Sequence, residues 1–82
     1  MVNINIMNIV IAGVGYGGLV SGLGLAKLGH DIQFLDIDEE KINLLSKGES
    51  PFYEPELDLY INNKDFCERL NFIDKYENIR WD

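Results

Sequence analysis

The pattern of apolar and polar residues predicts three strands separated by helical segments. Residues Ile4–Ala12 are rich in Ile and Val, with Ile9–Ile11 unbroken, which is typical of a strand buried on both faces of a parallel sheet. A second short apolar run, Asp31–Asp36, ends in an acid, and Ile79–Asp82 begins like a third strand. The chain therefore has the spacing of strands joined by longer connections, rather than that of hairpins.

Three further segments have helical patterns. Leu19–Leu28 is apolar nearly all round, which suits a helix that packs on a sheet and is covered on its other side, and Gly29 follows it as a helix-ending glycine. Glu56–Ile61 predicts a short helix whose first turn contains Pro55. Between Lys64 and Tyr76 one apolar stripe has helical spacing i, i+4 and i+7, formed by Phe66, Leu70 and Ile73.

A fourth helix is marked by its end signals. Asp38 is placed as its N-cap, two acids follow on the positive end of the helix dipole, and Gly48 ends it. Ile37 and Ile42 have the spacing of a hydrophobic staple across that N-cap. A loop with two prolines, Gly48–Pro55, follows the helix.

Strands that alternate with helices indicate the α/β class, here a Rossmann-type half-domain. We expect three parallel strands in the order 3-2-1, with flanking helices and right-handed crossovers. The chain has 82 residues and so allows one small core, since a chain this short buries only about 60–65% of its unfolded surface. We find no repeat and no linker, and therefore treat residues 1–82 as a single partial domain.

The charge is unevenly distributed and excludes some partners. Seven Lys and Arg face fourteen Asp and Glu, a net charge of -7, and Lys27 and Asp31 are the only charged residues before Asp36. An excess of acids repels a nucleic-acid backbone, and no run approaches the ~20 apolar residues of a membrane span.

A single cysteine, Cys67, fits a reducing cytoplasm. The opening residues lack the basic start of a signal peptide, and either Met1 or Met7 suits a native start.

A glycine-rich turn joins the first strand to the first helix. Residues Gly13–Gly18 form the pattern G-x-G-x-x-G, and Asp36 lies eighteen residues after Gly18, near the ~20 expected for a ribose-binding acid. Such a turn offers backbone amides and a helix N-terminus to two phosphates, while the acid binds ribose hydroxyls and repels the 2′-phosphate of NADP. The motif predicts NAD or ADP-ribose as ligand. The alternative is a turn without a ligand and an Asp that only caps a strand.

Several stretches together resemble one family. They are Gly13-Val14-Gly15-Tyr16-Gly17-Gly18-Leu19-Val20-Ser21-Gly22, Leu28-Gly29-His30, Asp36-Ile37-Asp38-Glu39-Glu40-Lys41-Ile42 and Tyr53-Glu54-Pro55. The chain resembles the amino-terminal end of the UDP-glucose/GDP-mannose dehydrogenases, nucleotide-sugar 6-dehydrogenases that use NAD. The resemblance thins after Leu59. Gly17 stands where the family usually has valine, and Glu56 where it commonly has glycine.

The resemblance implies a set of cofactor-binding residues. The pyrophosphate would be held by Gly13, Val14, Gly15, Tyr16, Gly17 and Gly18. Asp36, with Ile37 rather than an arginine beside it, would bind the adenosine ribose, and Lys41 would reach toward the adenosine end. Lys41 also has a simpler interpretation as a solvated helix charge that offsets two neighbouring acids.

The resemblance also implies that the chain alone is catalytically incomplete. The family oxidises a primary alcohol twice to a carboxylate, with a cysteine nucleophile and substrate contacts that lie far downstream of this segment. We expect Cys67 to be a buried or half-buried helix thiol, His30 a loop residue, and Tyr76 and Trp81 core or covering aromatics. The alternative function is a non-catalytic nucleotide-binding or interaction module. In either case the long first strand predicts pairing with a second copy or a complementing chain.

Overall fold

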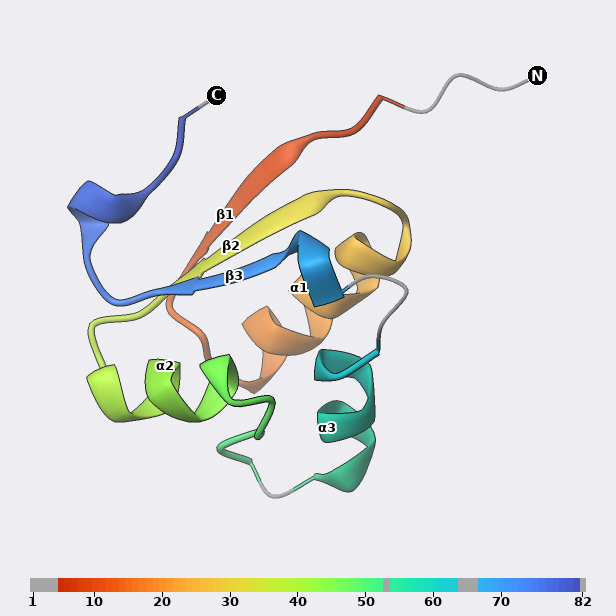
Figure 1. Ribbon diagram of the computed structural model, residues 1–82, viewed down its shortest axis with the longest axis vertical. Coiled ribbons are helices and arrows are strands. Elements are labelled where there is room, and N and C mark those ends of the chain that lie inside the picture. The colour runs from red at the N-terminus through yellow and green to blue at the C-terminus, as the bar shows by residue number, and fades with distance from the viewer. Residues whose placement is uncertain (1–4, 53, 64–66, 82) are drawn as a thin grey trace.

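Three parallel strands form the sheet on which the rest of the chain packs (Figure 1). The computed structural model describes residues 5–52, 54–63 and 67–81. The strands are β1 (Asn8–Ala12), β2 (Asp31–Leu35) and β3 (Leu70–Ile73), and they lie in the order β1-β2-β3. β1 is shorter than its apolar run because it pairs with β2 only from Asn8, opposite Asp31, to Ala12.

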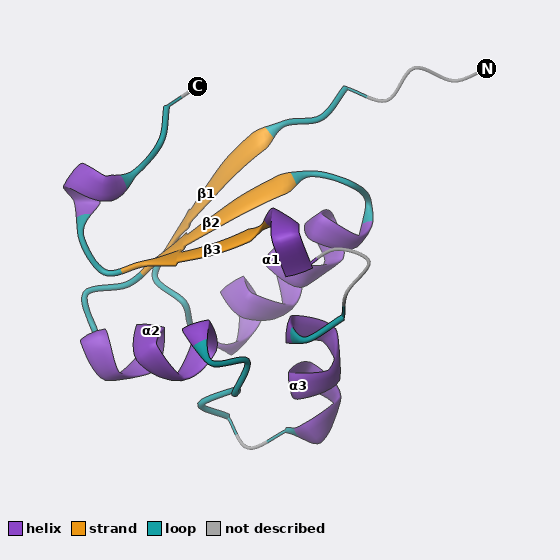
Figure 2. Ribbon diagram, viewed as in Figure 1, coloured by secondary structure: helices purple, strands orange, loops and turns teal. Residues whose placement is uncertain are grey.

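The α-helices of the described segments gather on one face of this sheet (Figure 2). They are α1 (Tyr16–Lys27), α2 (Glu39–Ser46) and α3 (Pro55–Ile61), and two short 3₁₀ turns span Cys67–Arg69 and Tyr76–Asn78. α1 lies on β2, α2 lies near β3, and α3 packs against α1. The expectation that α1 is covered on two sides is therefore confirmed in part, since Leu19, Leu23 and Ala26 are buried whereas Val20 is 41% exposed.

The core lies between the central strand and α1. Ile32 and Phe34 of β2 are fully buried, and the ring of Phe34 stacks on that of Phe72 from β3 with a centroid distance of 5.2 Å. Gly22 of α1 lies against the same ring, so closely that a Cβ there would be 2.4 Å from two Phe34 carbons. Helix and sheet thus meet at a glycine, which allows a closer approach than any residue with a Cβ.

The predicted cap at Asp38 and the predicted helix-ending glycines Gly29 and Gly48 are confirmed. The Asp38 carboxylate accepts a hydrogen bond from the Lys41 amide at 3.2 Å and so caps α2. Gly29 and Gly48 have φ angles of +107° and +83°. Each donates its amide to the carbonyl three residues earlier, and the next residue bonds five residues back, which is the Schellman arrangement.

The predicted hydrophobic staple is wrong. Ile42 is 5% exposed and packs in the core, but Ile37 is 90% exposed. The Asp36 carboxylate accepts a hydrogen bond from the Asp38 amide at 3.0 Å, and this turn directs Ile37 into solvent.

The helix predicted over Lys64–Tyr76 is also wrong. Residues Leu70–Ile73 form β3, in register with Ile32–Leu35, and Phe66 lies outside the described residues. Leu70 and Phe72 pack against the core, which is the alternation of a strand. The segment Leu-Asn-Phe-Ile-Asp that starts at Leu70 repeats the pattern Ile-Gln-Phe-Leu-Asp of β2, a signal that the helical stripe concealed.

The predicted third strand at residues 79–82 is not formed among its described residues, 79–81. The backbone of Arg80 pairs instead with a side chain: its amide donates to Gln33 Oε1 at 2.8 Å, and its carbonyl accepts from Gln33 Nε2 at 2.8 Å. The Asn8 side chain completes this network, donating to the Arg80 carbonyl and accepting from Gln33. Gln33 is 1% exposed, so the chain end crosses the sheet face opposite α1 and satisfies a buried amide there.

Four other residues complete the comparison with the sequence. Cys67 is half-buried as expected, but in a 3₁₀ turn rather than an α-helix. His30 lies in the connection between α1 and β2, where its Nδ1 accepts the Met7 amide. Tyr76 and Trp81 are each 68% exposed, so a core position is wrong for both. Their rings lie against each other with a centroid distance of 6.1 Å. In the described part of the chain no helix is long and apolar enough to span a membrane.

Candidate nucleotide-binding site

The carboxyl ends of the three strands meet at one edge of the sheet, where α1 and α2 begin. Two backbone hydrogen bonds continue the sheet past its strands at this edge, from the Gly13 amide to the Leu35 carbonyl at 2.8 Å and from the Asp36 amide to the Ile73 carbonyl at 3.2 Å. The glycine-rich turn and Asp36, distant in sequence, are thereby held side by side. In open α/β sheets this edge is where ligands bind.

The glycines of the turn differ in their backbone conformation and surroundings. Gly13 has a φ of +85°, a conformation that L side chains rarely adopt. Gly18 packs closely, because a Cβ there would be 3.0 Å from the Gly13 carbonyl and 3.3 Å from Ile11 Cγ2. Gly15 and Gly17 have open space around them, since a Cβ added at either position would meet nothing within 4 Å. Of the three motif glycines, Gly13 is required by its backbone conformation and Gly18 by close packing. Gly15 leaves the backbone accessible to a ligand.

The first turn of α1 presents free backbone donors. The first helical hydrogen bond runs from the Leu19 amide to the Gly15 carbonyl at 2.9 Å. The amides of Tyr16, Gly17 and Gly18 find no acceptor among the described residues, as expected for the start of a helix. These donors and the helix dipole form an anion-binding position.

Asp36 is the most connected side chain of the site. Its Oδ2 accepts the Val14 amide at 2.8 Å and the Lys41 ammonium at 3.2 Å, and its Oδ1 accepts the Asp38 amide. The Asp38 amide foremost, then the Val14 amide and Lys41, lower the pKa of Asp36 below its usual 3.8, against the opposing effect of burial. Asp36 is therefore an anion at neutral pH, fixed in orientation by the turn it faces.

Lys41 and Ile37 flank this carboxylate differently. The Lys41 side chain is 24% exposed and forms an ion pair with Asp36, so its charge is not simply solvated. Any movement of Lys41 away from Asp36 breaks this ion pair. Ile37 extends into solvent beside Asp36. Sequence reasoning placed both residues at this site, and the structure brings both to it.

Sequence reasoning missed a contact between the turn and the proline-containing loop. The Tyr16 hydroxyl donates to Glu54 Oε2 at 3.2 Å, and the Tyr16 ring meets Phe52 edge to face at 5.7 Å. The hydrogen bond to Glu54 and its negative charge raise the pKa of Tyr16 above 10.0. Tyr53, from the motif that suggested this loop, lies outside the described residues. No local sequence pattern signals a contact over 38 residues.

Comparison with known proteins places this site in a family. The model of the UDP-glucose/GDP-mannose dehydrogenase family, NAD binding domain, matches residues 7–80. The chain is 44% identical over 71 residues to UDP-glucose 6-dehydrogenase YwqF of Bacillus subtilis, and 47% identical over 68 residues to UDP-glucose 6-dehydrogenase of Rhizobium meliloti. These alignments cover 87% and 83% of this chain but 16% of each relative, so the chain spans about a sixth of their length.

Solved structures give the same result. A UDP-glucose dehydrogenase from Pyrobaculum islandicum matches with a TM-score of 0.78 and 28% identity, and GDP-mannose dehydrogenase from Pseudomonas aeruginosa, solved as a ternary complex, matches with 0.72 and 30%. Each match covers 87% of this chain and 16% of the solved one. The matched segment includes both the glycine turn and Asp36. The chain belongs to the UDP-glucose/GDP-mannose dehydrogenase family and corresponds to its NAD-binding domain.

Proposed function

We propose that NAD binds across the carboxyl edge of the sheet, with its pyrophosphate on the glycine turn and its adenosine ribose on Asp36. The hydrogen bond from the Val14 amide to Asp36 Oδ2 carries this proposal, because it fixes the acid next to the turn that would hold the phosphates. Gly15 and Gly17 leave room for a ligand, and the free amides of the first turn of α1 supply donors. The adjacent parallel strands in the order β1-β2-β3 support this placement, and we propose that they are the 3-2-1 half of a Rossmann sheet.

The acceptor positions of Asp36 define how a ribose would bind. A carboxylate offers about four lone-pair positions, and three are occupied here, two on Oδ2 and one on Oδ1. One ribose hydroxyl can use the remaining position on Oδ1. The second ribose hydroxyl can bind Oδ2 only if the Lys41 ammonium gives up its hydrogen bond to that atom. The ammonium would then lie beside the same ribose. Lys41 is thus a neighbour of the adenosine end rather than a phosphate ligand.

Ile37 adds an apolar surface to this end of the site. The Ile37 side chain is 90% exposed. An adenine ring that covered it would remove apolar surface from water, which would contribute favourably to the binding free energy. An arginine at this position would instead attract a 2′-phosphate. Asp36 and Ile37 together favour NAD over NADP.

Calorimetric titration of the chain with NAD, ADP-ribose and NADP tests this assignment. We expect NAD and ADP-ribose to bind at least about tenfold more tightly than NADP, which corresponds to about 1.4 kcal/mol. Asp36→Asn removes the charge that repels the 2′-phosphate and should reduce this preference. Asp38→Asn is the matched control, because it removes the same charge nearby while an Asn still caps α2. Equal or tighter binding of NADP by the unaltered chain would contradict the assignment of Asp36.

For the whole protein we propose NAD-dependent oxidation of the CH₂OH group of a nucleotide sugar to a carboxylate. The family membership and the relatives named UDP-glucose 6-dehydrogenase support this activity. The 82-residue chain corresponds to a sixth of such an enzyme, and we expect it to form no NADH from UDP-glucose, UDP-N-acetylated sugars or GDP-mannose. NADH formation that is lost in Cys67→Ala would overturn this expectation. A cytoplasmic location stays a prediction.

We also propose that β1 pairs with a second copy or with a complementing chain. β1 is an edge of the described sheet and has one neighbouring strand, β2. Its residues Ile9–Ile11 are uncharged and half-buried, which makes the edge a template for strand addition. This contact is also the basis of the alternative function as a non-catalytic interaction module. A monomeric mass at tens of micromolar, with a cooperative melt, would contradict the pairing.

A further inference from the structure

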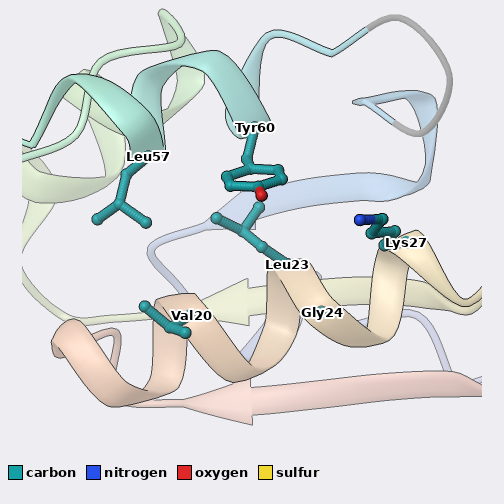
Figure 3. Close-up of a pocket in the computed structure, with 6 residues that line it drawn as sticks. All are labelled: Val20, Leu23, Gly24, Lys27, Leu57 and Tyr60. Carbon is teal, nitrogen blue, oxygen red and sulfur yellow. The ribbon is translucent and has the colours of Figure 1, made fainter.

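A groove between α1 and α3 has no role in the proposed NAD site. It is lined by Val20, Leu23, Gly24 and Lys27 of α1 and by Leu57 and Tyr60 of α3, and has a volume of about 230 Å³ (Figure 3). It follows the middle and last turns of α1, whereas the glycine turn, Gly13–Gly18, extends only into the first turn of that helix. Gly24 forms part of its floor, and the absence of a side chain there keeps the groove open, since a Cβ would meet nothing within 4 Å.

Two polar groups stand at one end of this otherwise apolar groove. In Figure 3 the Tyr60 ring descends from α3 over Leu23, and the Lys27 side chain extends from α1 with its nitrogen toward Tyr60. Within the described parts of the chain, neither the Lys27 ammonium nor the Tyr60 hydroxyl has a hydrogen-bond or ion-pair partner. An ammonium and a hydroxyl that converge on one end of an apolar surface are the donors that an anionic oxygen acceptor requires.

The local charge favours an anion at this end. Lys27 is the only Lys or Arg before Asp36. The acids of α3 lie in its first turn, at Glu56 and Asp58, whereas Tyr60 lies toward the other end of that helix. Asp58 is engaged elsewhere, because its Oδ1 accepts the Ser50 amide at 2.6 Å. The positive charge of Lys27 is thus not cancelled by an ion pair within the described residues, despite the net charge of -7.

We propose that this groove binds a small amphipathic carboxylate, with its apolar body on Leu23, Leu57 and Val20 and its carboxylate on Lys27 and Tyr60. At about 30 Å³ for each water-sized unit, the volume accommodates roughly eight non-hydrogen atoms. A six-membered ring or a short acyl chain with one carboxylate has this size. The site is independent of the NAD site and goes beyond the proposed function.

Benzoate and benzamide are the matched probes, because they share size and ring and differ in charge. In a ¹H–¹⁵N NMR titration of the chain, benzoate should bind with a dissociation constant on the order of millimolar, as expected for so small a ligand. The amides of Val20, Gly24, Lys27, Leu57 and Tyr60 should shift, and those of Gly13–Gly18 should not. Benzamide should bind about three- to fivefold more weakly, the contribution of one exposed ion pair.

Variants separate the carboxylate contact from the apolar contact. Lys27→Met keeps the apolar stem and should abolish the preference for benzoate over benzamide, whereas Lys75→Met, the same change at another exposed lysine, should retain it. Gly24→Leu should fill the groove and remove the shifts from both probes while the spectrum stays that of a folded chain. Equal affinity of the two probes for the unaltered chain, shifts that map outside the groove, or no shifts at all would each overturn the proposal.

Discussion

Two glycines one half-turn apart in α1 should respond oppositely to the same substitution. Gly22 and Gly24 both lie in the interior of the helix, so alanine at either position gains about 0.8–1.0 kcal/mol in helix propensity. The surroundings differ. A Cβ at position 22 would lie 2.4 Å from two carbons of the Phe34 ring and 2.8 Å from Ile11 Cδ1, whereas a Cβ at position 24 meets nothing within 4 Å.

The magnitude follows from the difference between the two variants. The propensity gain is common to both, so the difference in their free energies of unfolding isolates the overpacking at position 22, typically 1–3 kcal/mol. We expect the upper part of this range. Phe34 is fully buried and stacks on Phe72 at 5.2 Å, so the ring has no space into which to retreat. A contact of 2.4 Å also lies far inside the ~3.5–4.0 Å optimum of two carbons.

Urea unfolding followed by far-ultraviolet circular dichroism measures this difference. Gly24→Ala should be more stable than the unaltered chain by about 0.5–1 kcal/mol, and Gly22→Ala less stable than Gly24→Ala by about 2–3 kcal/mol. For a domain of this size each kcal/mol corresponds to about 4–8 °C in Tm, so thermal melts give a second measure. Free energies of unfolding that agree within about 0.3 kcal/mol for the two variants would refute the close packing of α1 on β2.

Three further outcomes are expected. Gly17→Ala should raise the free energy of unfolding by about 0.5–1 kcal/mol, because a Cβ at that position meets no atom within 4 Å and its φ is not left-handed; a destabilised variant in the same urea assay would contradict this geometry. Gln33→Leu should cost about 1–3 kcal/mol, since it leaves the Arg80 amide and Asn8 Oδ1 without the partners they have in Gln33, and increased amide exchange at Arg80 should accompany the loss. Asp36 has a pKa below its usual 3.8, so its contribution to the free energy of unfolding is complete above that unfolded value and is lost as pH falls through the folded value. Asp36→Asn should flatten this acid limb of the stability profile, and an unchanged profile would contradict the assignment.

Much of the fold follows from local sequence signals. Asp38, Gly29 and Gly48 end their helices where the pattern predicts, because capping depends on the conformation of a few adjacent residues. The start of α1 was placed three residues late, at Leu19 instead of Tyr16. Two glycines, Gly17 and Gly18, occupy its first turn and hide it, because glycine has a low helix propensity. Of the two, Gly18 packs closely against Gly13 and Ile11.

The segment after α3 is a strand where the sequence pattern predicts a helix. Its apolar residues fit both a helical stripe and a strand, and a short run cannot distinguish the two. Pairing with β2 makes this segment a strand, because Phe72 then stacks on Phe34 and Leu70 faces the same core. Strand identity here depends on a partner 38 positions earlier in the chain, in register Ile32 with Leu70, which no local window contains.

The candidate site likewise has features that the local sequence predicts and contacts that only the tertiary structure creates. By itself the sequence determined that a glycine turn follows one strand and that an acid ends the next, since motif and spacing are local properties. Only the tertiary structure decided that Val14 donates to Asp36, that Lys41 occupies one of its oxygens and that Tyr16 meets Glu54. Lys41 lies only five positions after Asp36, but the other two bonds join residues that are 22 and 38 positions apart in the sequence. The bond from Val14 to Asp36 requires β1 and β2 to lie side by side, and the bond from Tyr16 to Glu54 requires the start of α1 to lie near the start of α3.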